Sequence, residues 1–294
     1  MAIRQTKTEK AATGVFYLFI IGLCIITLYP FIYVFCYSIS DGAAAAATVI
    51  TVYPVGPTLE NYTAVFNDKN LVNAFIVSVS RTVLGTLCTL FVTMLAAYAL
   101  SKPNLVAKKF IMWFFMITMY FNAGMLPNFV LMTKLNLLNN FLVYLLPVMF
   151  STYYMIIFKS FFEQIPSSLL ESAVLDGASE FVVFTQIVIP SSTAVIATIA
   201  LFAGVWQWNA YFDGILYVSE PSLQPLQTLM YRILQGEQAF SLSQIAAAEQ
   251  GARRVTSEGI KMSMLIVSTV PILCVYPFLQ KYFVKGIMLG AVKG

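Results

Sequence analysis

The chain has 294 residues, of which 59% are apolar and only 10% are charged, and its formal net charge is +4. Soluble domains carry about 25% charged residues, so this chain lacks the charge to cover a soluble surface and must use lipid as solvent. Histidine is absent, which excludes histidine-based acid–base catalysis and histidine metal ligands. No basic run is dense enough to indicate nucleic-acid binding.

Six apolar stretches are long enough to span a bilayer, since a spanning helix needs about 20 apolar residues. Their continuous runs favour helices over the alternating segments of a β-barrel. The predicted fold class is therefore all-α, a polytopic membrane protein with about six transmembrane helices. The stretches cover residues 14–39, 71–100, 110–132, 141–158, 187–213 and 262–283.

The first stretch has two interpretations. Basic residues before it and the alanines at 43–47 are typical of a cleaved signal peptide, but its apolar run exceeds the 7–15 residues of a signal h-region. We therefore favour an uncleaved helix. The four cysteines lie in apolar stretches without CxxC spacing, so we expect small buried side chains and no metal site. They are Cys24, Cys36, Cys88 and Cys274.

Orientation follows from the excess of Lys and Arg in cytoplasmic segments. With the N-terminus inside, ten basic residues lie in cytoplasmic segments and six lie outside, three of these in one long loop where the rule is weaker. Both termini are therefore predicted to be cytoplasmic. Residues 40–70 and 214–261 become external loops, and residues 243–250 within the second loop are predicted as a short helix.

The cytoplasmic connection between the fourth and fifth stretches predicts a short amphipathic helix and a turn. Pro166 ends the preceding pattern, Ser168 and Glu171 have the spacing of a capping box, and Gly177 lets the helix stop. Ser179 can begin the next helix. An apolar helical face beside charged residues suits docking into a groove of another protein. The apolar positions of that face are Leu169, Leu170, Ala173 and Val174.

The same segment resembles the EAA loop of bacterial ATP-binding-cassette importers. That motif has an EAA triplet, three residues, Gly, nine residues, Ile, one residue, Leu and Pro. The spacing matches throughout, with Ser in the triplet and Ile at the Leu position as departures of similar size. The matching residues are Glu171, Ser172, Ala173, Gly177, Ile187, Ile189 and Pro190.

Residues 93–102, 204–217 and 276–294 also resemble the sugar-permease group that includes the smaller permease of the maltose importer, and the likeness is greatest to permeases for complex oligosaccharides. The resemblance implies a cytoplasmic N-terminus at 1–13, a permease domain at 14–283 with the EAA loop at 163–190, and a cytoplasmic tail at 284–294. It places the chain in the bacterial inner membrane.

The resemblance further implies that the EAA helix docks in a cleft of a cytoplasmic ATPase dimer, where Glu171 pairs with a basic group and Gly177 allows the bend. The tail from residue 285 is implied to reach the same interface. The implied partners include a second, different permease subunit and an extracytoplasmic substrate-binding protein. The implied coupling residues are Glu171, Ser172, Ala173, Asp176, Gly177, Ile187 and Pro190.

The sequence contains no GxxxxGK[ST] motif, so it has no P-loop to hold ATP phosphates. We expect no cofactor on this chain, and the resemblance puts ATP and Mg on the partner ATPase. An ion-coupled transporter would need carboxylates within the membrane helices, and only Asp213 lies near a predicted helix. An intramembrane enzyme would want paired carboxylates or a Ser/Lys arrangement, which the sequence lacks. A permease without covalent chemistry is therefore the favoured function.

Candidate pathway residues are less specific. Arg81 lies within the second stretch, where a charge marks a functional site, an inward structural partner or snorkelling to the surface. Asn122, Gly124 and Pro127 interrupt the third stretch, which permits a broken helix or an ordinary kink. Aromatic and polar residues near the end of the fifth stretch suit sugar binding, although Trp and Tyr also form interfacial belts. These are Trp206, Gln207, Trp208, Asn209, Tyr211 and Asp213.

Overall fold

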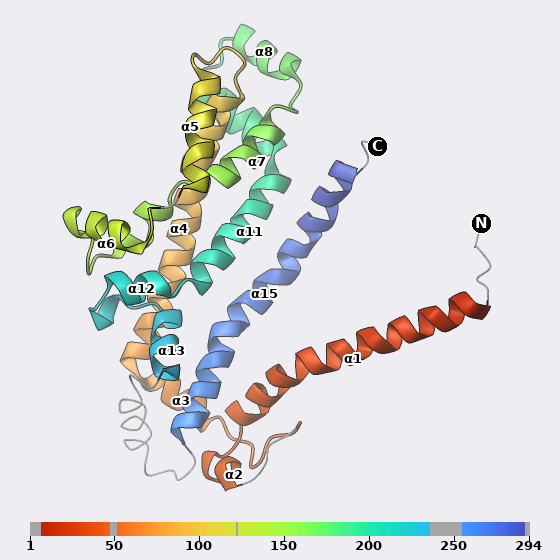
Figure 1. The fold of residues 1–294 in the computed structure, drawn as a ribbon, viewed down its shortest axis with the longest axis vertical. Helices are drawn as coiled ribbons and strands as arrows, with labels where there is room; N and C mark the ends of the chain where they lie inside the picture. Colours follow the sequence, from red (N-terminus) through yellow and green to blue (C-terminus); the bar gives the residue numbers. More distant parts are fainter. Residues whose placement is uncertain (1–6, 48–51, 122, 236–254, 292–294) are drawn as a thin grey trace. The chain divides into compact units, whose positions relative to one another are not determined.

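Figure 1 shows a computed structural model of the chain, which describes residues 7–47, 52–121, 123–235 and 255–291. In these ranges the regular elements are helices, and no strand occurs. The all-α prediction is therefore confirmed. The chain divides into two compact units, Met1–Lys69 with Arg232–Thr269 and Asn70–Tyr231 with Val270–Gly294.

Three helices are long and apolar enough to cross a bilayer alone: α1 (Lys7–Ser38), α4 (Lys69–Ser101) and α15 (Ser257–Ala291). Three more spans are pairs of shorter helices that bend by more than 40° at a short break. By length and composition the described chain therefore has up to six spans, as predicted. The pairs are α5 (Lys108–Tyr120) with α6 (Met125–Lys134), residues 141–148 with α7 (Thr152–Phe162), and residues 180–191 with α11 (Thr193–Asn209).

The first break was predicted, and the structure resolves the alternatives in favour of a broken helix. Gly124 precedes α6 with φ of 87°, a left-handed conformation that Gly adopts without strain. Asn122 itself lies outside the described residues.

The other two breaks were missed, because each sits in an apolar run. The fourth span begins as two 3₁₀ turns, η1 (Phe141–Tyr144) and η2 (Leu146–Val148), and α7 starts only after Ser151, whose Oγ accepts a hydrogen bond from the N–H of Tyr154. In the fifth span a bend of 83° separates residues 180–191 from α11.

The fifth span also ends earlier than predicted. The predicted stretch reaches residue 213, whereas α11 ends at Asn209 because Ala210 is extended with ψ of 124°. The short helix α12 (Phe212–Tyr217) then follows. The turn η4 (Pro221–Leu223) and the helix α13 (Leu226–Leu234) lie within the predicted external loop 214–261. The helix predicted at 243–250 lies outside the described residues.

The first unit ties the end of α1 to the predicted external loop 40–70, which holds the helices α2 (Gly42–Ala47) and α3 (Glu60–Asn67). The buried side chain of Asn61 donates hydrogen bonds to the carbonyls of Ser38 and Ser40 at 3.1 and 3.0 Å. The hydroxyl of Ser263 on α15 also donates to the Ser38 carbonyl at 3.3 Å. The backbone groups left open at the end of α1 are therefore satisfied within the chain.

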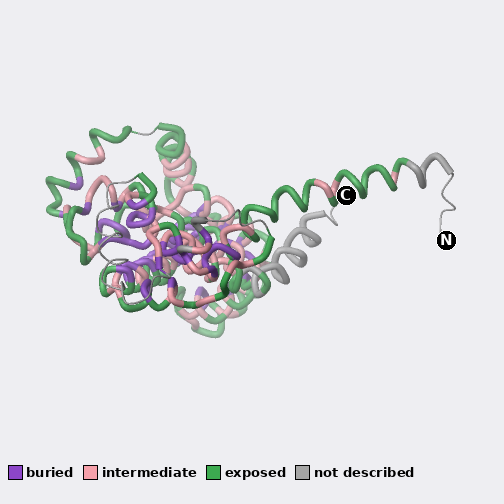
Figure 2. The backbone as a smooth tube through the Cα atoms, turned by 90° about the horizontal axis from the view of Figure 1, so that it is seen from below, coloured by how far each residue is buried: buried purple, intermediate pink, exposed green. Residues whose placement is uncertain are grey.

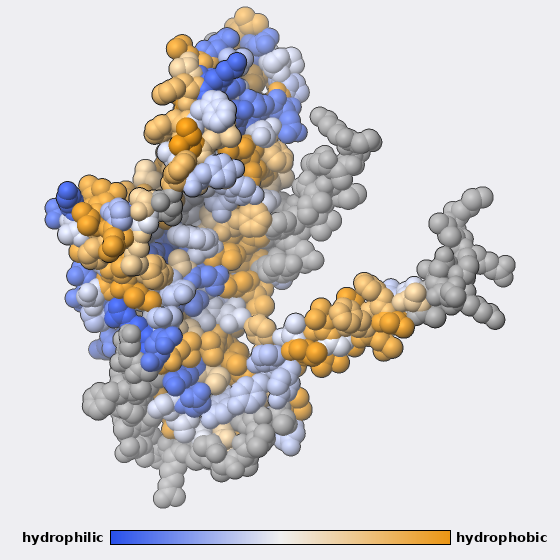
Figure 3. Space-filling view, in the orientation of Figure 1, coloured by the Kyte–Doolittle hydropathy of each residue, from blue (hydrophilic) through white to orange (hydrophobic). Residues whose placement is uncertain are grey.

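The second unit has its main core between α4, α7 and the helical segment 180–199. Residues such as Ala97, Met155, Phe158 and Val183 are fully buried there. Large apolar side chains elsewhere face outward, and Figure 2 shows most of α1 as exposed. Figure 3 shows apolar surface along α1 and around α6, as expected for helices that contact lipid.

The cysteine prediction was partly wrong. Cys36 is buried, but Cys24 and Cys274 are exposed. All four cysteines are free.

Candidate functional site

The predicted coupling helix exists as α8 (Ser167–Leu175), but its start differs from the prediction. The N-cap is Pro166, and no side-chain hydrogen bond caps the helix, so the predicted capping box of Ser168 and Glu171 is wrong. The fixed φ of Pro166, here −54°, sets the helix start two residues earlier than a cap at Ser168 would.

The apolar residues of α8 fall into two groups, one packed against the core and one exposed. Leu170 and Ala173 pack against the core formed by α4, α7 and residues 180–199. Leu169, Val174 and Leu175 stay exposed, and Leu175 is 88% exposed. The acidic side chains of Glu171 and Asp176 are also exposed. α8 therefore rests on the chain by one edge and presents apolar and acidic groups outward.

The C-terminal end of α8 is a Schellman motif centred on Gly177. Gly177 has φ of 86°, the N–H of Gly177 bonds the Val174 carbonyl at 3.0 Å, and the N–H of Ala178 bonds the Ala173 carbonyl at 2.9 Å. Ser179 then caps α9 (Glu180–Val183) through its side chain. Both predictions, a helix stop at Gly177 and a new start at Ser179, are confirmed.

A network of ion pairs braces the segments that flank α8. Glu180 binds Lys102 at 2.7 Å and accepts the Tyr98 hydroxyl at 2.5 Å, which joins α9 to the end of α4. Glu163 binds Lys159 at 2.8 Å and Lys108 at 3.1 Å, which joins the ends of α7 and α5. Burial raises the pKa of Glu163, but the hydrogen bonds from the two lysines outweigh it, so that this pKa lies below its ordinary value.

The remaining motif residues lie at an irregular stretch of helix. Ile187 is in the π-helical turn η3 (Phe184–Val188), and Pro190 is exposed in the short helix α10 (Ile189–Ser191) just before the 83° bend. Pro190 has no N–H, and its ring would clash with the carbonyl of residue 186 in a regular α-helix. The wider π-helical turn accommodates this clash.

An open cavity of about 1210 Å³ lies in the second unit, lined by α6, η2, α11, α12 and part of α15. Trp206, Asn209, Tyr211 and Asp213 all line it, as the pathway prediction expects. Trp208 does not: it is 6% exposed and packs edge-on against Phe75, with ring centroids 5.9 Å apart. Two residues apart on a helix point to nearly opposite faces, so Trp206 and Trp208 cannot share a wall.

Arg81 lies behind this cavity wall and is fully buried. Its guanidinium binds both carboxylate oxygens of Asp213 at 2.6 and 3.1 Å, the Oε1 atom of Gln207 at 3.1 and 3.3 Å, and the Ala210 carbonyl at 3.1 Å. The guanidinium also lies over the ring of Tyr144, 4.4 Å from its centroid.

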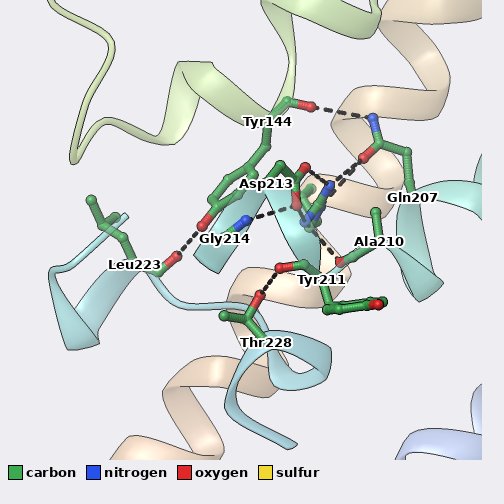
Figure 4. A network of polar contacts seen from close by, with 9 residues as sticks. Tyr144, Gln207, Ala210, Tyr211, Asp213, Gly214, Leu223 and Thr228 are labelled. Carbon is green, nitrogen blue, oxygen red and sulfur yellow. Dashed lines mark hydrogen bonds and ion pairs between the residues drawn. The ribbon is translucent and has the colours of Figure 1, made fainter. Parts of the chain in front are cut away.

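These five bonds use all five N–H groups of the arginine. Snorkelling is therefore excluded for Arg81, and the interpretation that fits is an inward partner. Asp213, whose side chain is 21% exposed, is the member of the pair that reaches the cavity. Figure 4 shows the network around Tyr144, Gln207 and Asp213.

Two further residues complete this network. Gln207, from the cluster noted at the end of the fifth stretch, is 1% exposed and its Nε2 donates to the Tyr144 carbonyl at 3.3 Å. Sequence analysis missed Tyr144, which is fully buried and whose hydroxyl donates to the Leu223 carbonyl at 3.1 Å. A buried charge needs polar partners, and Gln207 supplies one to Arg81. No group of three or more Cys, Asp or Glu side chains that could hold a metal occurs among the described residues.

A broken-helix membrane bundle, with an exposed helix at one end and a cavity between broken spans, defines a membrane transport subunit. The family model described as "Binding-protein-dependent transport system inner membrane component" matches residues 89–289. The chain belongs to this family of inner-membrane permeases.

Curated relatives extend over almost the whole chain. The polygalacturonan/rhamnogalacturonan transport system permease protein YtcP of Bacillus subtilis is 36% identical over 95% of this chain and 96% of that protein. The trehalose/maltose transport system permease protein MalG of Thermococcus litoralis is 28% identical over 94% of this chain and 96% of that protein. These relatives are transport permeases, and this chain is likewise a permease subunit of an ATP-binding-cassette importer and not an enzyme.

A solved structure agrees with the fold. A chain of a bacterial ABC transporter involved in the import of the acidic polysaccharide alginate matches with a TM-score of 0.88 and 28% identity, over 96% of this chain and 100% of that chain.

Proposed function

We propose that this chain forms one half of the passage through which an oligosaccharide enters the cytoplasm, driven by a separate ATPase docked on α8. The exposed outer face of α8 is the observation that carries this proposal. A helix that leaves Leu169, Val174 and Leu175 in contact with water, beside two carboxylates, has the composition of a helix that fits a partner groove. The acidic groups favour a groove with a basic rim.

The ion pairs around α8 support a role for this helix in transmitting movement from the ATPase to the membrane spans. Two ion pairs of 2.7 and 3.1 Å, Lys102–Glu180 and Lys108–Glu163, connect the flanks of α8 to the end of α4 and the start of α5. A push on α8 would therefore move several spans together. ATP and Mg would bind the partner, and a second permease would close the cavity, which in this chain alone is open on one side.

The cargo is proposed from the chemistry of the cavity and from the relatives. Trp206 and Tyr211 offer aromatic faces to sugar C–H groups, and Asn209 and Asp213 offer polar atoms to hydroxyls. Polygalacturonan, rhamnogalacturonan, trehalose, maltose and alginate appear in the names of the relatives. A sugar delivered by an extracytoplasmic binding protein, with both termini of this chain in the cytoplasm, is the arrangement we propose.

Purification of the full chain in mild detergent, with mass spectrometry of the proteins that accompany it, tests the assembly. We expect a cytoplasmic ATPase and a second permease. Recovery of the chain alone, or only with itself, would contradict the proposal and favour an ion-coupled transporter.

Substitutions on α8 locate the docking site. Leu175→Ser and Glu171→Ala should reduce recovery of the ATPase and cut uptake, while the amount of chain in the membrane stays constant. Val106→Ser is the matched control, because Val106 is 85% exposed but lies outside α8. Equal ATPase recovery in all three variants would rule out α8 as the docking helix.

A further inference from the structure

A row of buried small and polar residues follows one face of α4. Its members are spaced by three or four residues, so they lie on one face of the helix. We name this row the α4 polar stripe. All its members are buried within the second unit, and they are Ser78, Arg81, Gly85, Thr89 and Thr93.

The α4 polar stripe bonds the backbone of other segments at or next to the ends of their helices. Thr89 donates to the Val148 carbonyl at 2.9 Å, and Thr93 accepts from the N–H of Ser151 at 3.3 Å, on either side of the break in the fourth span. Each bond joins α4 to a residue more than 50 positions away in the sequence. Both partners are backbone groups that the break has removed from a regular helix.

The same pattern holds at the other end of the stripe. Arg81 donates to the carbonyl of Ala210, the residue at which α11 ends. The hydroxyl of Ser78 accepts from the N–H of Leu226, the first residue of α13, at 2.8 Å. The positive guanidinium also complements the negative end of the α11 dipole.

Gly85 contributes to the packing of α4 against α11 through its lack of a side chain. An ideal Cβ on Gly85 would overlap the amide of Gln207. A larger residue at this position would push Gln207 away from Arg81. The stripe therefore combines donors and acceptors with one gap that lets α11 approach.

Unpaired backbone groups are costly inside a membrane, and broken helices persist only where other groups satisfy them. Two of the sites that the stripe bonds also supply residues to the cavity wall. Val148 lies just before the break in the fourth span, and Ala210, Tyr211 and Asp213 follow the end of α11. The stripe residue Arg81 is not itself in that lining, because it lies one layer behind it.

We propose that the α4 polar stripe positions the wall of the cavity, with Thr89 and Arg81 as positioning residues that set which side chains face the cargo. Cargo selection would then be altered by Arg81, which does not line the cavity. The proposal rests on the proposed function only for the identity of the cargo, since the geometry of the wall is a property of the chain itself.

Thiol labelling of the full chain tests this without cargo or ATPase. The four native cysteines are replaced by serine, a reporter Val148→Cys is added, and its reaction rate with a charged, water-soluble methanethiosulfonate is measured in detergent. Loss of the hydrogen bond in Thr89→Val should change this rate about fivefold, since such a bond contributes between about twofold and tenfold to an equilibrium. Thr89→Ser keeps the hydroxyl and should restore the rate to within about twofold of the parent chain.

Thr198→Val is the matched control, because the Thr198 hydroxyl bonds only the Ala194 carbonyl of its own helix, at 2.9 Å. It should leave the rate unchanged. A second reporter, Ala210→Cys combined with Arg81→Lys, tests the other end of the stripe, because lysine keeps the charge but loses the five-donor fork.

Rates unchanged by both Thr89→Val and Arg81→Lys would overturn the proposal, whatever the chain transports. A rate that shifts equally in Thr89→Ser would also overturn it, because side-chain volume and not the hydroxyl would then be responsible. Failure of the proposed function would appear separately, as loss of partner recovery or uptake with these labelling rates intact.

Discussion

Two glycines on facing helices should respond to alanine with opposite signs. Gly85 on α4 and Gly204 on α11 are both interior to helices, where replacing Gly by Ala stabilises by about 0.5–1 kcal/mol. At Gly204 the new Cβ would lie 3.5 Å from the Thr86 hydroxyl, an ordinary contact. We therefore expect Gly204→Ala to stabilise the chain by roughly that amount.

At Gly85 the same gain is outweighed by a loss. The added Cβ must displace the buried amide of Gln207, which accepts two hydrogen bonds from Arg81 and donates one to the Tyr144 carbonyl. Three such bonds, two of them to a charged group, contribute about 3.5–7.5 kcal/mol together. The net effect of Gly85→Ala, if all three bonds are lost, is then a destabilisation of about 2.5–7 kcal/mol.

Thermal unfolding in detergent, followed by gel filtration of the surviving fraction, measures both variants against the parent chain. The unfolding temperature should rise for Gly204→Ala and fall by several degrees for Gly85→Ala. If Gly85→Ala were as stable as Gly204→Ala, the amide of Gln207 would not be held where the structure has it, and the argument for a gap in the α4 polar stripe would fail.

Three other outcomes can be measured in the same way. Asp213→Ala leaves Arg81 buried without its anion and should lower the free energy of unfolding by about 3–5 kcal/mol, with a smaller loss for Asp213→Asn; a loss below about 1 kcal/mol would contradict the pairing. Gly177→Ala should cost about 1 kcal/mol through its left-handed φ alone, because nothing lies within 4 Å of the added Cβ, and a neutral result would refute a strained position. The pKa of Glu163 is lowered in the folded chain, so its carboxylate stabilises the folded state. This contribution to the free energy of unfolding is complete above the ordinary pKa of about 4.3 and is lost as the pH falls through the lower pKa of the folded chain. Because this side chain is 37% exposed, the contribution is below about 1 kcal/mol, and Glu163→Gln should flatten the dependence of the unfolding temperature on pH between about 3 and 6.

Hydropathy was sufficient to predict the number of spans, because only lipid can solvate six apolar runs of this length. It could not predict the break at Ser151, because a hydrogen bond from a residue distant in the sequence supports it. Thr93 satisfies the N–H of Ser151 from 58 positions away. A local pattern contains no information on such a partner.

The coupling segment was predicted better, since its features are local. Gly177 and Ser179 act through their own backbone and side-chain conformations, and both behave as the sequence indicates. Ser168 failed as a cap because Pro166, two positions earlier, fixes the helix start first. Of the pathway residues, Trp208 was misassigned because composition marks a cluster of aromatic residues but not the side of the helix that each one faces.

The two ends of α8 are set by Pro166 and Gly177, whose effects lie in their own backbone angles and do not depend on any neighbouring side chain. The residues between them can therefore change without altering where the helix begins or ends. Such a helix has fixed ends and an outer surface whose residues can vary. Under the proposed function, substitutions at the outer positions 169, 171, 174 and 175 would adapt the chain to a different ATPase without changing its membrane part.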